Sequence, residues 1–264
     1  MASTIGRIPV LDIWPTVDGG KRATKAVVDE SITISATVFR EGHDNVAAEV
    51  ILVNPLGVDE SRHRMVLVGQ GTDRYEVSVR FPSIGDWQFR IEAWSDVVGT
   101  WQHHLDVKVP ANVDVELEFA EGAVIINRII GAAPASDAAT LNALLKKIVD
   151  HKKDPTERLA ATHDDAVIAA LGRNPIRELV SNYGPFPVKV ERRRALYGSW
   201  YEFFPRSEGA AKKKNGSWAS GTFKTASKRL AAVADMGFHV LYLPPIHPIG
   251  ESFRKGPNNT LTPG

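Results

Sequence analysis

The stretch that most constrains the fold is the last one, residues 192–264. Residues 196–204 are aromatic and extended in character. Residues 223–236 carry apolar side chains at helical spacing, and Gly237 stands where a glycine ends a helix. Residues 239–250 are a nearly continuous apolar run closed by prolines, which is typical of a strand in a parallel sheet covered by helices. The sequence therefore predicts one strand–helix–strand unit, which needs further strands to bury itself and finds none in this chain.

Up to about Pro110 the pattern is different, because apolar and polar residues alternate. A chain of 264 residues leaves room for such a second domain. The alternation has the period of half-buried antiparallel strands and covers residues 32–38, 75–81, 87–93 and 101–107. Clusters of Gly, Asn, Asp and Pro separate these segments. Short strands at this spacing predict a β-sandwich, which we assign as an immunoglobulin-like domain over residues 1–110.

Between these regions, residues 111–190 have the apolar period of helices and predict a small helical bundle. Residues 182–192 are expected to connect this bundle to the last region. The first helix could also begin as a strand, because residues 113–119 alternate. The expected helices cover residues 113–130, 140–149, 156–161, 166–171 and 176–180.

The helix ends carry recognisable signals. Ser136 or Asp137 is a plausible N-cap for the second helix. Pro155 and Pro175 stand where proline opens a helix. Residues 163–165, His-Asp-Asp, could form a metal ligand set, but Asp164 more simply caps the helix that follows. We therefore predict no metal site here.

Composition excludes several classes of function. The chain has no cysteine, so disulfides, zinc thiolates and a thiol nucleophile are ruled out. A net charge of +1 does not provide the excess of positive charge that is typical of nucleic-acid-binding proteins. No apolar run approaches the roughly 20 residues that span a bilayer, and the first residues do not resemble a secretory signal. We expect a cytoplasmic protein that binds neither nucleic acid nor membrane.

Isolated aromatic, histidine and lysine side chains are candidates for ligand sites. Trp94 falls on the face of its strand opposite Trp87, where it could stack on a sugar or pack against a neighbouring domain; packing is favoured. His103 and His104 are adjacent on a predicted strand, so they point to opposite faces and cannot chelate one metal. The lysine run 212–214 could attract a sugar phosphate, but a solvated run is favoured.

Three segments of the last region carry a family resemblance: Trp-Tyr-Glu-Phe-Phe-Pro-Arg-Ser at 200–207, the run from Ala234 to Gly250 with its Pro-Pro-Ile-His-Pro, and Arg-Lys-Gly-Pro-Asn-Asn from Arg254 to Asn259. Together they resemble the α-1,4-glucan:maltose-1-phosphate maltosyltransferases, a branch of the α-amylase-like superfamily. The resemblance implies a β-sandwich, a helical insertion domain involved in dimerisation, and then a (β/α)8 barrel. Residues 191–264 would be the first two strands and one helix of that barrel, truncated in this chain.

The resemblance also implies a reaction. Family members transfer maltosyl units from α-maltose 1-phosphate to the non-reducing end of α-1,4-glucans and release phosphate, by retaining double displacement without a cofactor. Retention requires two close carboxyl groups, which in the family lie on later barrel strands. No catalytic residue is therefore assigned in this chain, and Glu202 and Asp235 are expected to be structural. By the family pattern Lys255 binds donor sugar hydroxyls, with Asn258 and Asn259 less favoured.

Several expectations follow for the chain by itself. We expect it to be a fragment, inactive alone and able to form a homodimer. Two barrel strands alone would expose Leu241, Leu243 and Ile246 to water, so residues 195–264 are expected to be disordered or sticky in isolation. The alternatives are a non-catalytic glucan-binding or dimerisation module and another α-amylase-superfamily enzyme. A dinucleotide-binding domain is disfavoured, because no Gly-x-Gly-x-x-Gly follows the first strand of the last region.

Overall fold

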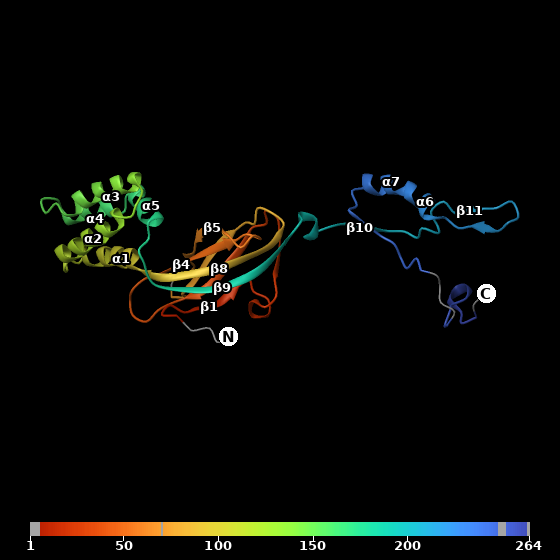
Figure 1. The fold of residues 1–264 in the computed structure, drawn as a ribbon, viewed down its shortest axis with the longest axis horizontal. Helices are drawn as coiled ribbons and strands as arrows, with labels where there is room; N and C mark the ends of the chain where they lie inside the picture. Colours follow the sequence, from red (N-terminus) through yellow and green to blue (C-terminus); the bar gives the residue numbers. More distant parts are fainter. Residues whose placement is uncertain (1–5, 70, 248–251, 263–264) are drawn as a thin grey trace. The chain divides into compact units, whose positions relative to one another are not determined.

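The computed structural model describes residues 6–69, 71–247 and 252–262. It forms two compact units, Met1–Glu191 and Arg192–Gly264, which are described separately (Figure 1). The first unit contains two sheets and a group of helices. The second contains the short strands and helices of the C-terminal region.

The larger sheet of the first unit is five-stranded and is centred on its two longest strands, β8 and β9. These strands are antiparallel, and β9 also pairs in parallel with the edge strand β2. In β8 the alternating residues Trp87, Phe89, Ile91 and Ala93 point into the core, as their period predicts. The spatial order is β2 (Thr24–Val27), β9 (Arg177–Glu191), β8 (Gly85–Asp96), β4 (Val46–Val53) and β5 (Asp59–Arg64).

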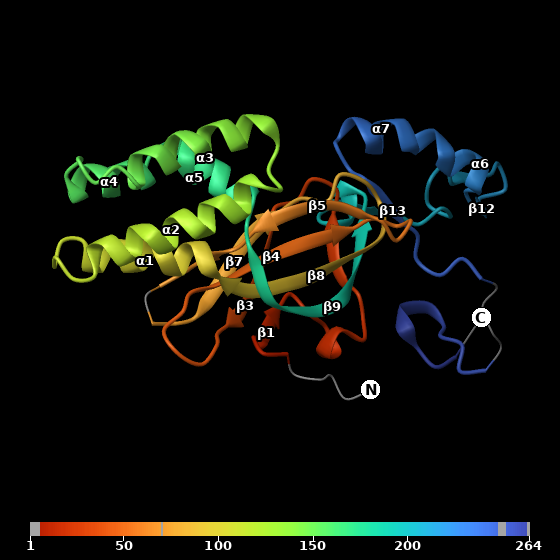
Figure 2. The ribbon, with the colours of Figure 1, turned by 60° about the vertical axis from the view of Figure 1, so that its left-hand side comes forward.

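The second sheet is four-stranded and antiparallel, and it packs face to face on the first in a sandwich-like arrangement (Figure 2). One apolar core lies between them, with Ile34 and Ala36 from one sheet and Val50 and Phe89 from the other. Burial of each large apolar side chain there stabilises the folded state by roughly 1.5–3 kcal/mol. The order is β1 (Val10–Trp14), β3 (Ile32–Val38), β7 (Arg74–Val79) and β6 (Val66–Leu67), with the 3-10 turn η1 (Asp18–Gly20) after β1.

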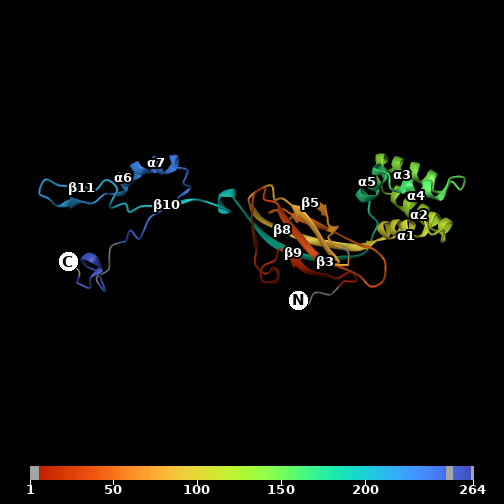
Figure 3. The ribbon, with the colours of Figure 1, turned by 180° about the vertical axis from the view of Figure 1, so that it is seen from behind.

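The helices of the first unit lie in the chain between β8 and β9 and gather beyond one end of the sheets (Figures 1 and 3). They bury an apolar core of their own around Trp101, Phe119 and Leu144. Asp154 caps the helix that Pro155 opens, and Asp164 caps the next, so both predicted starts are confirmed. The helices are α1 (Val97–Lys108), α2 (Val115–Ile130), α3 (Ala135–Ile148), α4 (Pro155–Thr162) and α5 (Asp165–Arg173).

The predicted strand over residues 101–107 is wrong, because this segment lies in α1. Val98, Trp101 and Leu105 are buried at spacings of three and four, which is the helical period. The carboxylate of Asp96 caps the helix by accepting from the N–H of Gly99 at 3.1 Å. Over this short run the apolar residues fit the period of a strand and also that of a helix. The N-cap interaction of Asp96 favours the helix.

The predicted helix over residues 176–180 and the predicted connection over 182–192 are also wrong. Both lie in β9, whose first residue, Arg177, pairs with Asp96 at the end of β8. Val188 and Val190 are buried in the sandwich core. Because prolines favour loops over strands, the sequence pattern predicts a connection here. The segment is a strand that completes the sandwich core.

The expected N-cap of α3 is wrong as well. This helix begins at Ala135 after Pro134, without a side-chain cap. The carboxylate of Asp137 instead accepts from both Arg173, at 2.7 and 3.1 Å, and the amide of Asn174, at 2.7 Å. Hydrogen bonds from Arg173 and then Asn174 hold the pKa of Asp137 below its usual value. This carboxylate ties α3 to the end of α5.

We expect Asp137→Asn to reduce the acid sensitivity of the helices. A carboxyl whose pKa is lower in the folded state stabilises it above the unfolded pKa of about 4, and this stability is lost as the pH falls through the folded pKa. The variant should melt at a lower temperature near neutral pH, and its melting temperature should then fall less on acidification. Thermal melts followed by circular dichroism at neutral and acidic pH measure this, with the exposed Asp165→Asn as the control. If the melting temperature of Asp137→Asn fell with pH as steeply as that of the unsubstituted chain, the carboxylate of Asp137 would not be the source of this acid sensitivity.

The second unit contains the predicted strand–helix–strand arrangement. Strands β10 (Trp200–Glu202) and β13 (Val240–Tyr242) pair in parallel, and the chain between them forms α6 (Phe223–Ala226), the 3-10 turn η3 (Ser227–Arg229) and α7 (Leu230–Asp235). Gly237 has a φ of 85°, so glycine ends this helix as predicted. Residues 248–250 of the predicted second strand lie outside the described residues. The unit also contains η2 (Arg193–Ala195), β11 (Ala211–Lys212), β12 (Trp218–Ala219) and η4 (Pro257–Asn259).

The apolar side chains of β13 and the residues after it are only partly covered. Leu241 and Leu243 are half-buried, and Ile246 is 51% exposed. The expected disorder of residues 195–264 in isolation stays a prediction. Limited proteolysis tests it: cleavage of this segment no faster than cleavage of the sheets would contradict it.

Candidate functional site

A cavity lies at the carboxyl ends of the two parallel strands of the C-terminal unit. Ligands of open and closed parallel sheets bind at this end of the strands. The cavity has a volume of about 230 Å³. We call it the strand-end cavity; it is lined by Phe204, Pro205, Arg206, Gly221, Thr222, Phe223, Pro244, Pro245 and Ile246.

The floor of this cavity is built by a tight approach of the loop after β10 to the start of α6. The N–H of Gly221 donates to the carbonyl of Arg206 at 2.8 Å. A Cβ on Gly221 would lie 2.1 Å from the carbonyl oxygen of Glu208, so only glycine fits. Thr222 caps α6 in a reciprocal capping box with Thr225, whose hydroxyl also donates to the carbonyl of Glu208 at 2.8 Å. The loop is therefore held in place.

Arg206 and Thr222 contribute the polar side chains of the strand-end cavity, and sequence reasoning missed both. A guanidinium offers five N–H donors and the hydroxyl offers one donor and two acceptor lone pairs, which suits a hydroxylated or phosphorylated ligand. Two signals could have found them. Arg206 follows Pro205 at the end of the first strand's aromatic run, and Thr222 stands at the N-cap position of the predicted helix.

The lysine run lies in a hairpin formed by β11 and β12, outside the lining of the strand-end cavity. Lys212 faces Trp218 across the hairpin, and the N–H of Lys213 donates to the carbonyl of Ser217 at 2.7 Å. Lys212, Lys213 and Lys214 are all exposed. Solvated lysines were the favoured interpretation, and their exposure agrees with it.

Lys255 is exposed and follows undescribed residues 248–251; it is not among the residues that line the strand-end cavity. Its neighbour Gly256 donates to the carbonyl of Thr260 at 2.8 Å, and a Cβ there would lie 1.9 Å from the carbonyl oxygen of Thr262. Asn258 and Asn259 have φ values of 51° and 61°. Both asparagines thus adopt the left-handed conformation of a tight turn, and the role of Lys255 stays a prediction.

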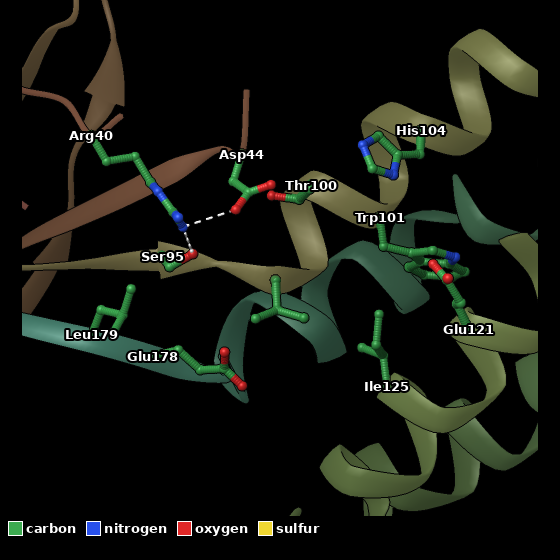
Figure 4. Close-up of a pocket in the computed structure, with 11 residues that line it drawn as sticks. Arg40, Asp44, Ser95, Thr100, Trp101, His104, Glu121, Ile125, Glu178 and Leu179 are labelled. Atoms are coloured by element: carbon green, nitrogen blue, oxygen red, sulfur yellow. Dashed lines mark hydrogen bonds and ion pairs between the residues drawn. The ribbon is translucent and has the colours of Figure 1, made fainter. Parts of the chain in front are cut away.

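A second cavity, of about 310 Å³, lies between the sheets and the helices of the first unit (Figure 4). We call it the junction cavity. Arg40 donates to the hydroxyl of Ser95 at 2.5 Å and pairs with Asp44 at 3.0 Å, so its charge is already matched. It is lined by Arg40, Asp44, Ser95, Val97, Thr100, Trp101, His104, Glu121, Ile125, Glu178 and Leu179.

Comparison with known proteins decides the family. Domain N/S of the alpha-1,4-glucan:maltose-1-phosphate maltosyltransferases matches residues 6–192. The chain belongs to this maltosyltransferase family. The resemblance seen in the sequence is thereby confirmed.

Named maltosyltransferases are similar over almost the whole chain. Alpha-1,4-glucan:maltose-1-phosphate maltosyltransferase 1 of Streptomyces coelicolor is 48% identical over 98% of this chain and 38% of its own length. The maltosyltransferase of Arcanobacterium haemolyticum is 43% identical, with the same coverage of both chains. That of Mycobacterium tuberculosis is 35% identical over 97% of this chain and 40% of its own length. The chain therefore spans about two-fifths of the length of these relatives.

In this member of the maltosyltransferase family Trp94 is not a sugar platform, because two guanidinium groups cover its indole. The guanidinium of Arg177 lies 4.3 Å and that of Arg64 4.6 Å from the ring centroid, and the side chain is fully buried. Glu49 and Glu92 accept hydrogen bonds from Arg177. Although burial acts to lower it, these bonds raise the pKa of Arg177. Packing is thus favoured over sugar stacking, but the groups that cover Trp94 come from β5 and β9 of the same sheet and not from a neighbouring domain.

In this maltosyltransferase chain three histidines are candidates for metal ligands by sequence: His163, His103 and His104. His163 pairs with Asp106 at 2.7 Å while Asp164 caps α5. His103 and His104 lie on a helix, not a strand, and their ring centroids are 6.5 Å apart. Within the described ranges no group of three His, Cys, Asp or Glu side chains is placed to hold a metal. In the same part of the chain no helix is long and apolar enough to cross a bilayer.

Proposed function

We propose that the protein containing this chain transfers maltosyl units from α-maltose 1-phosphate to the non-reducing ends of α-1,4-glucans and releases phosphate. The observation that carries this proposal is the 48% identity over 98% of the chain to a protein named for this activity. The parallel pair β10–β13, with a cavity at its carboxyl ends, supports it, because barrel enzymes build their sites there.

The proposal includes an architecture. The sheets of residues 1–110, completed by β9, form an immunoglobulin-like domain, and the helices, assigned to residues 111–190 and extended by α1, form an insertion and dimerisation domain. Residues 191–264 begin the catalytic (β/α)8 barrel. The reaction is placed in the cytoplasm because its donor is a phosphorylated sugar.

The proposed mechanism is a retaining double displacement. One carboxylate attacks the anomeric carbon and displaces the phosphate, which a carboxylic acid protonates, leaving a maltosyl group covalently bound to the first carboxylate. The deprotonated second group then takes the proton of the acceptor hydroxyl, whose oxygen attacks the anomeric carbon and releases the first carboxylate. Neither carboxyl group is assigned in this chain, which we propose is inactive by itself. Lys255 donates hydrogen bonds from its ammonium group to donor sugar hydroxyls, and no cofactor takes part.

The first experiment reads the coding sequence after the codon of Gly264 and measures the mass of the protein in its cells. A longer frame that releases phosphate from α-maltose 1-phosphate only when a glucan acceptor is present supports the proposal. A short product that accumulates would refute catalysis by this gene. Activity without phosphate release would point to another α-amylase-superfamily enzyme.

In that longer protein, Lys255→Ala is expected to lower kcat/KM for α-maltose 1-phosphate at least tenfold. A hydrogen bond from a charged group is worth about 1.5–3 kcal/mol, and each 1.4 kcal/mol is a factor of ten. Initial rates of phosphate release measure the effect, with the exposed hairpin variant Lys213→Ala as the control. Equal losses in both variants would show that Lys255 has no specific role.

We further propose a homodimer formed through the helices. Leu117 and Val124 lie on one face of α2 and are 55% and 63% exposed. The double variant Leu117→Glu and Val124→Glu is expected to weaken dimerisation at least tenfold, because it places charges in an apolar contact. Light scattering after size-exclusion chromatography measures this, with Ile84→Glu, at an exposed position in the turn before β8, as the control. A monomeric unsubstituted chain would refute the dimer.

A non-catalytic role is the second candidate. The first unit has two apolar cores of its own, and the family match to residues 6–192 coincides with it. Such a unit could act as a glucan-binding or dimerisation module without the barrel. This alternative would be supported if the short chain were the product found in cells and if it sedimented with glucan.

A further inference from the structure

A bulge in the edge strand β1 turns a tryptophan outward. Leu11 pairs with Thr37 and Trp14 with Ser35, so β1 has one residue more than β3 between these pairs. Asp12 adopts a φ of 48° there. In an unbroken strand Trp14 would lie on the face opposite Leu11; the bulge places both on the outer face of the four-stranded sheet. Ile13 turns inward and packs against the core.

Trp14 is consequently 60% exposed beside Leu11, which is 47% exposed. A bulge that re-aims a side chain is a built feature, often found next to functional sites. An indole has an apolar face and an N–H donor, so an exposed one can contact a ligand that is both apolar and hydroxylated.

The rest of this outer face is a ladder of hydroxyl groups. It carries Thr33, Ser35 and Thr37 from β3, because their neighbours Ile34 and Ala36 point into the core. Ser78 lies opposite Thr33, with the two hydroxyl oxygens 3.4 Å apart. Hydroxyls donate and accept, as those of a sugar do.

Arg74 of β7 is fixed in this face by three contacts. It donates to the carbonyl of Asp12 at 2.8 Å, to the hydroxyl of Ser35 at 2.5 Å and to that of Thr37 at 3.3 Å. The first of these contacts holds the bulge itself. Two carboxylates bring negative charge to the same face: Glu76, which pairs with Ser35 across the sheet, and Asp12, which accepts from the hydroxyl of Thr37 at 3.5 Å. The face therefore has no excess of positive charge that would select a polyanion.

We propose that this outer face, formed by Leu11, Trp14, Thr33, Thr37, Arg74 and Ser78, binds an α-1,4-glucan chain. The indole of Trp14 stacks on the apolar C–H face of a glucose unit, and the hydroxyls and the guanidinium hydrogen-bond along the polymer. The surface has no excess of positive charge, which suits a neutral hydroxylated chain better than a polyanion. The choice of glucan rests on the proposed function, in which such a polymer is the acceptor.

The test is affinity electrophoresis of the full chain, residues 1–264, in gels containing soluble amylose. Trp14→Ala is expected to raise the apparent Kd for amylose at least tenfold, and Trp14→Tyr, which keeps an aromatic face, by threefold or less. Thr33→Val, which removes one hydroxyl from the ladder, should weaken retardation to an intermediate degree. The control is Leu56→Ala, whose side chain is 87% exposed in the turn between β4 and β5. It should leave retardation unchanged.

Retardation that is equal in the unsubstituted chain and Trp14→Ala would overturn the inference, and so would an unsubstituted chain that is not retarded. Equal retardation by hydroxyethyl cellulose, a β-linked glucan, would overturn its specificity. The proposed function is tested separately, by phosphate release with a short maltooligosaccharide acceptor in the longer protein. Lack of that activity would refute the transfer reaction and leave a Trp14-dependent retardation standing. Normal activity without the retardation would refute only this surface.

Discussion

Replacing Arg158 with methionine is expected to lower the free energy of unfolding of the helices by about 3 kcal/mol. The side chain of Arg158 is 1% exposed. Its Nε donates to the carbonyl of Ile148 at 2.9 Å, and its two terminal nitrogens donate to the carboxylate of Glu116 at 2.6 and 3.2 Å. The guanidinium also lies 3.8 Å from the centre of the Phe119 ring. One side chain thus joins α4 to α2 and to the end of α3.

The magnitude depends on what the substitution leaves behind. The carbonyl of Ile148 loses its guanidinium donor, and a buried polar group left unpaired costs about 1–3 kcal/mol. Lost contact with the aromatic ring adds about 1–2 kcal/mol. Glu116 is 56% exposed and can be hydrated again, so its loss is small. Methionine fills much of the vacated space and offsets part of the total.

Urea denaturation followed by far-ultraviolet circular dichroism measures this effect. Arg128→Met is the matched control: Arg128 lies on α2, is 53% exposed and pairs with Glu178 at 3.0 Å. An exposed ion pair is worth less than about 1 kcal/mol, so the control should change little. Equal midpoints for the two variants would show that burial of Arg158 does not stabilise the helices.

Gly122→Ala is expected to destabilise the same helices by about 2 kcal/mol, although alanine is the better helix former. A Cβ on Gly122 would lie 2.1 Å from Cζ2 and 2.6 Å from Nε1 of Trp101. Nε1 donates to the carbonyl of Glu118 at 2.9 Å, so the indole cannot move without losing a buried hydrogen bond of about 1 kcal/mol. Overpacking costs about 1–3 kcal/mol more, against about 1 kcal/mol gained in helix propensity.

Gly172→Ala provides the control, because a Cβ there meets nothing within 4 Å and Gly172 is also helical. It should stabilise the fold by about 0.5 kcal/mol. The same denaturation experiment, with tryptophan fluorescence as a second signal, compares the two variants. If both variants were more stable than the unsubstituted chain, α1 and α2 could move apart without losing stability, and the expected overpacking at Gly122 would be refuted.

Much of the fold could be predicted from the period of apolar residues. The strands β3, β7 and β8 and the helices α4 and α5 agree with their predicted segments, because each has one clear period. The helix α2 also lies where it was predicted, although residues 113–119 alternate as a strand would, and α3 begins at Ala135, earlier than predicted. The segment around Trp101 did not, because over seven residues an alternating pattern also fits a helix. The strand β9 was hidden by prolines, and the sandwich core that requires it is assembled from segments far apart in the sequence.

The candidate sites divide in the same way. Gly237 and Asp164 act locally, so their roles could be predicted from their neighbours. The cover of Trp94 could not, because Arg64 and Arg177 reach it from remote segments. The strand-end cavity lies at the carboxyl ends of the strands, where barrel enzymes build their sites, but the position of Arg206 in its lining depends on the folded loop and could not be predicted from neighbouring residues.

The helices leave the sheet at Asp96 and return at Arg177, and these two residues are paired. Roughly 80 residues of chain therefore have to be closed into a loop before β8 and β9 can meet at this end, at an entropic cost of about 4 kcal/mol for a flexible chain. A helical body that folds first on local contacts shortens this loop and brings its two ends together. The helices would then fold first, and the pairing of β8 with β9 would form last. By holding Asp96 and Arg177 close together, the folded helices would promote the pairing of these two central strands.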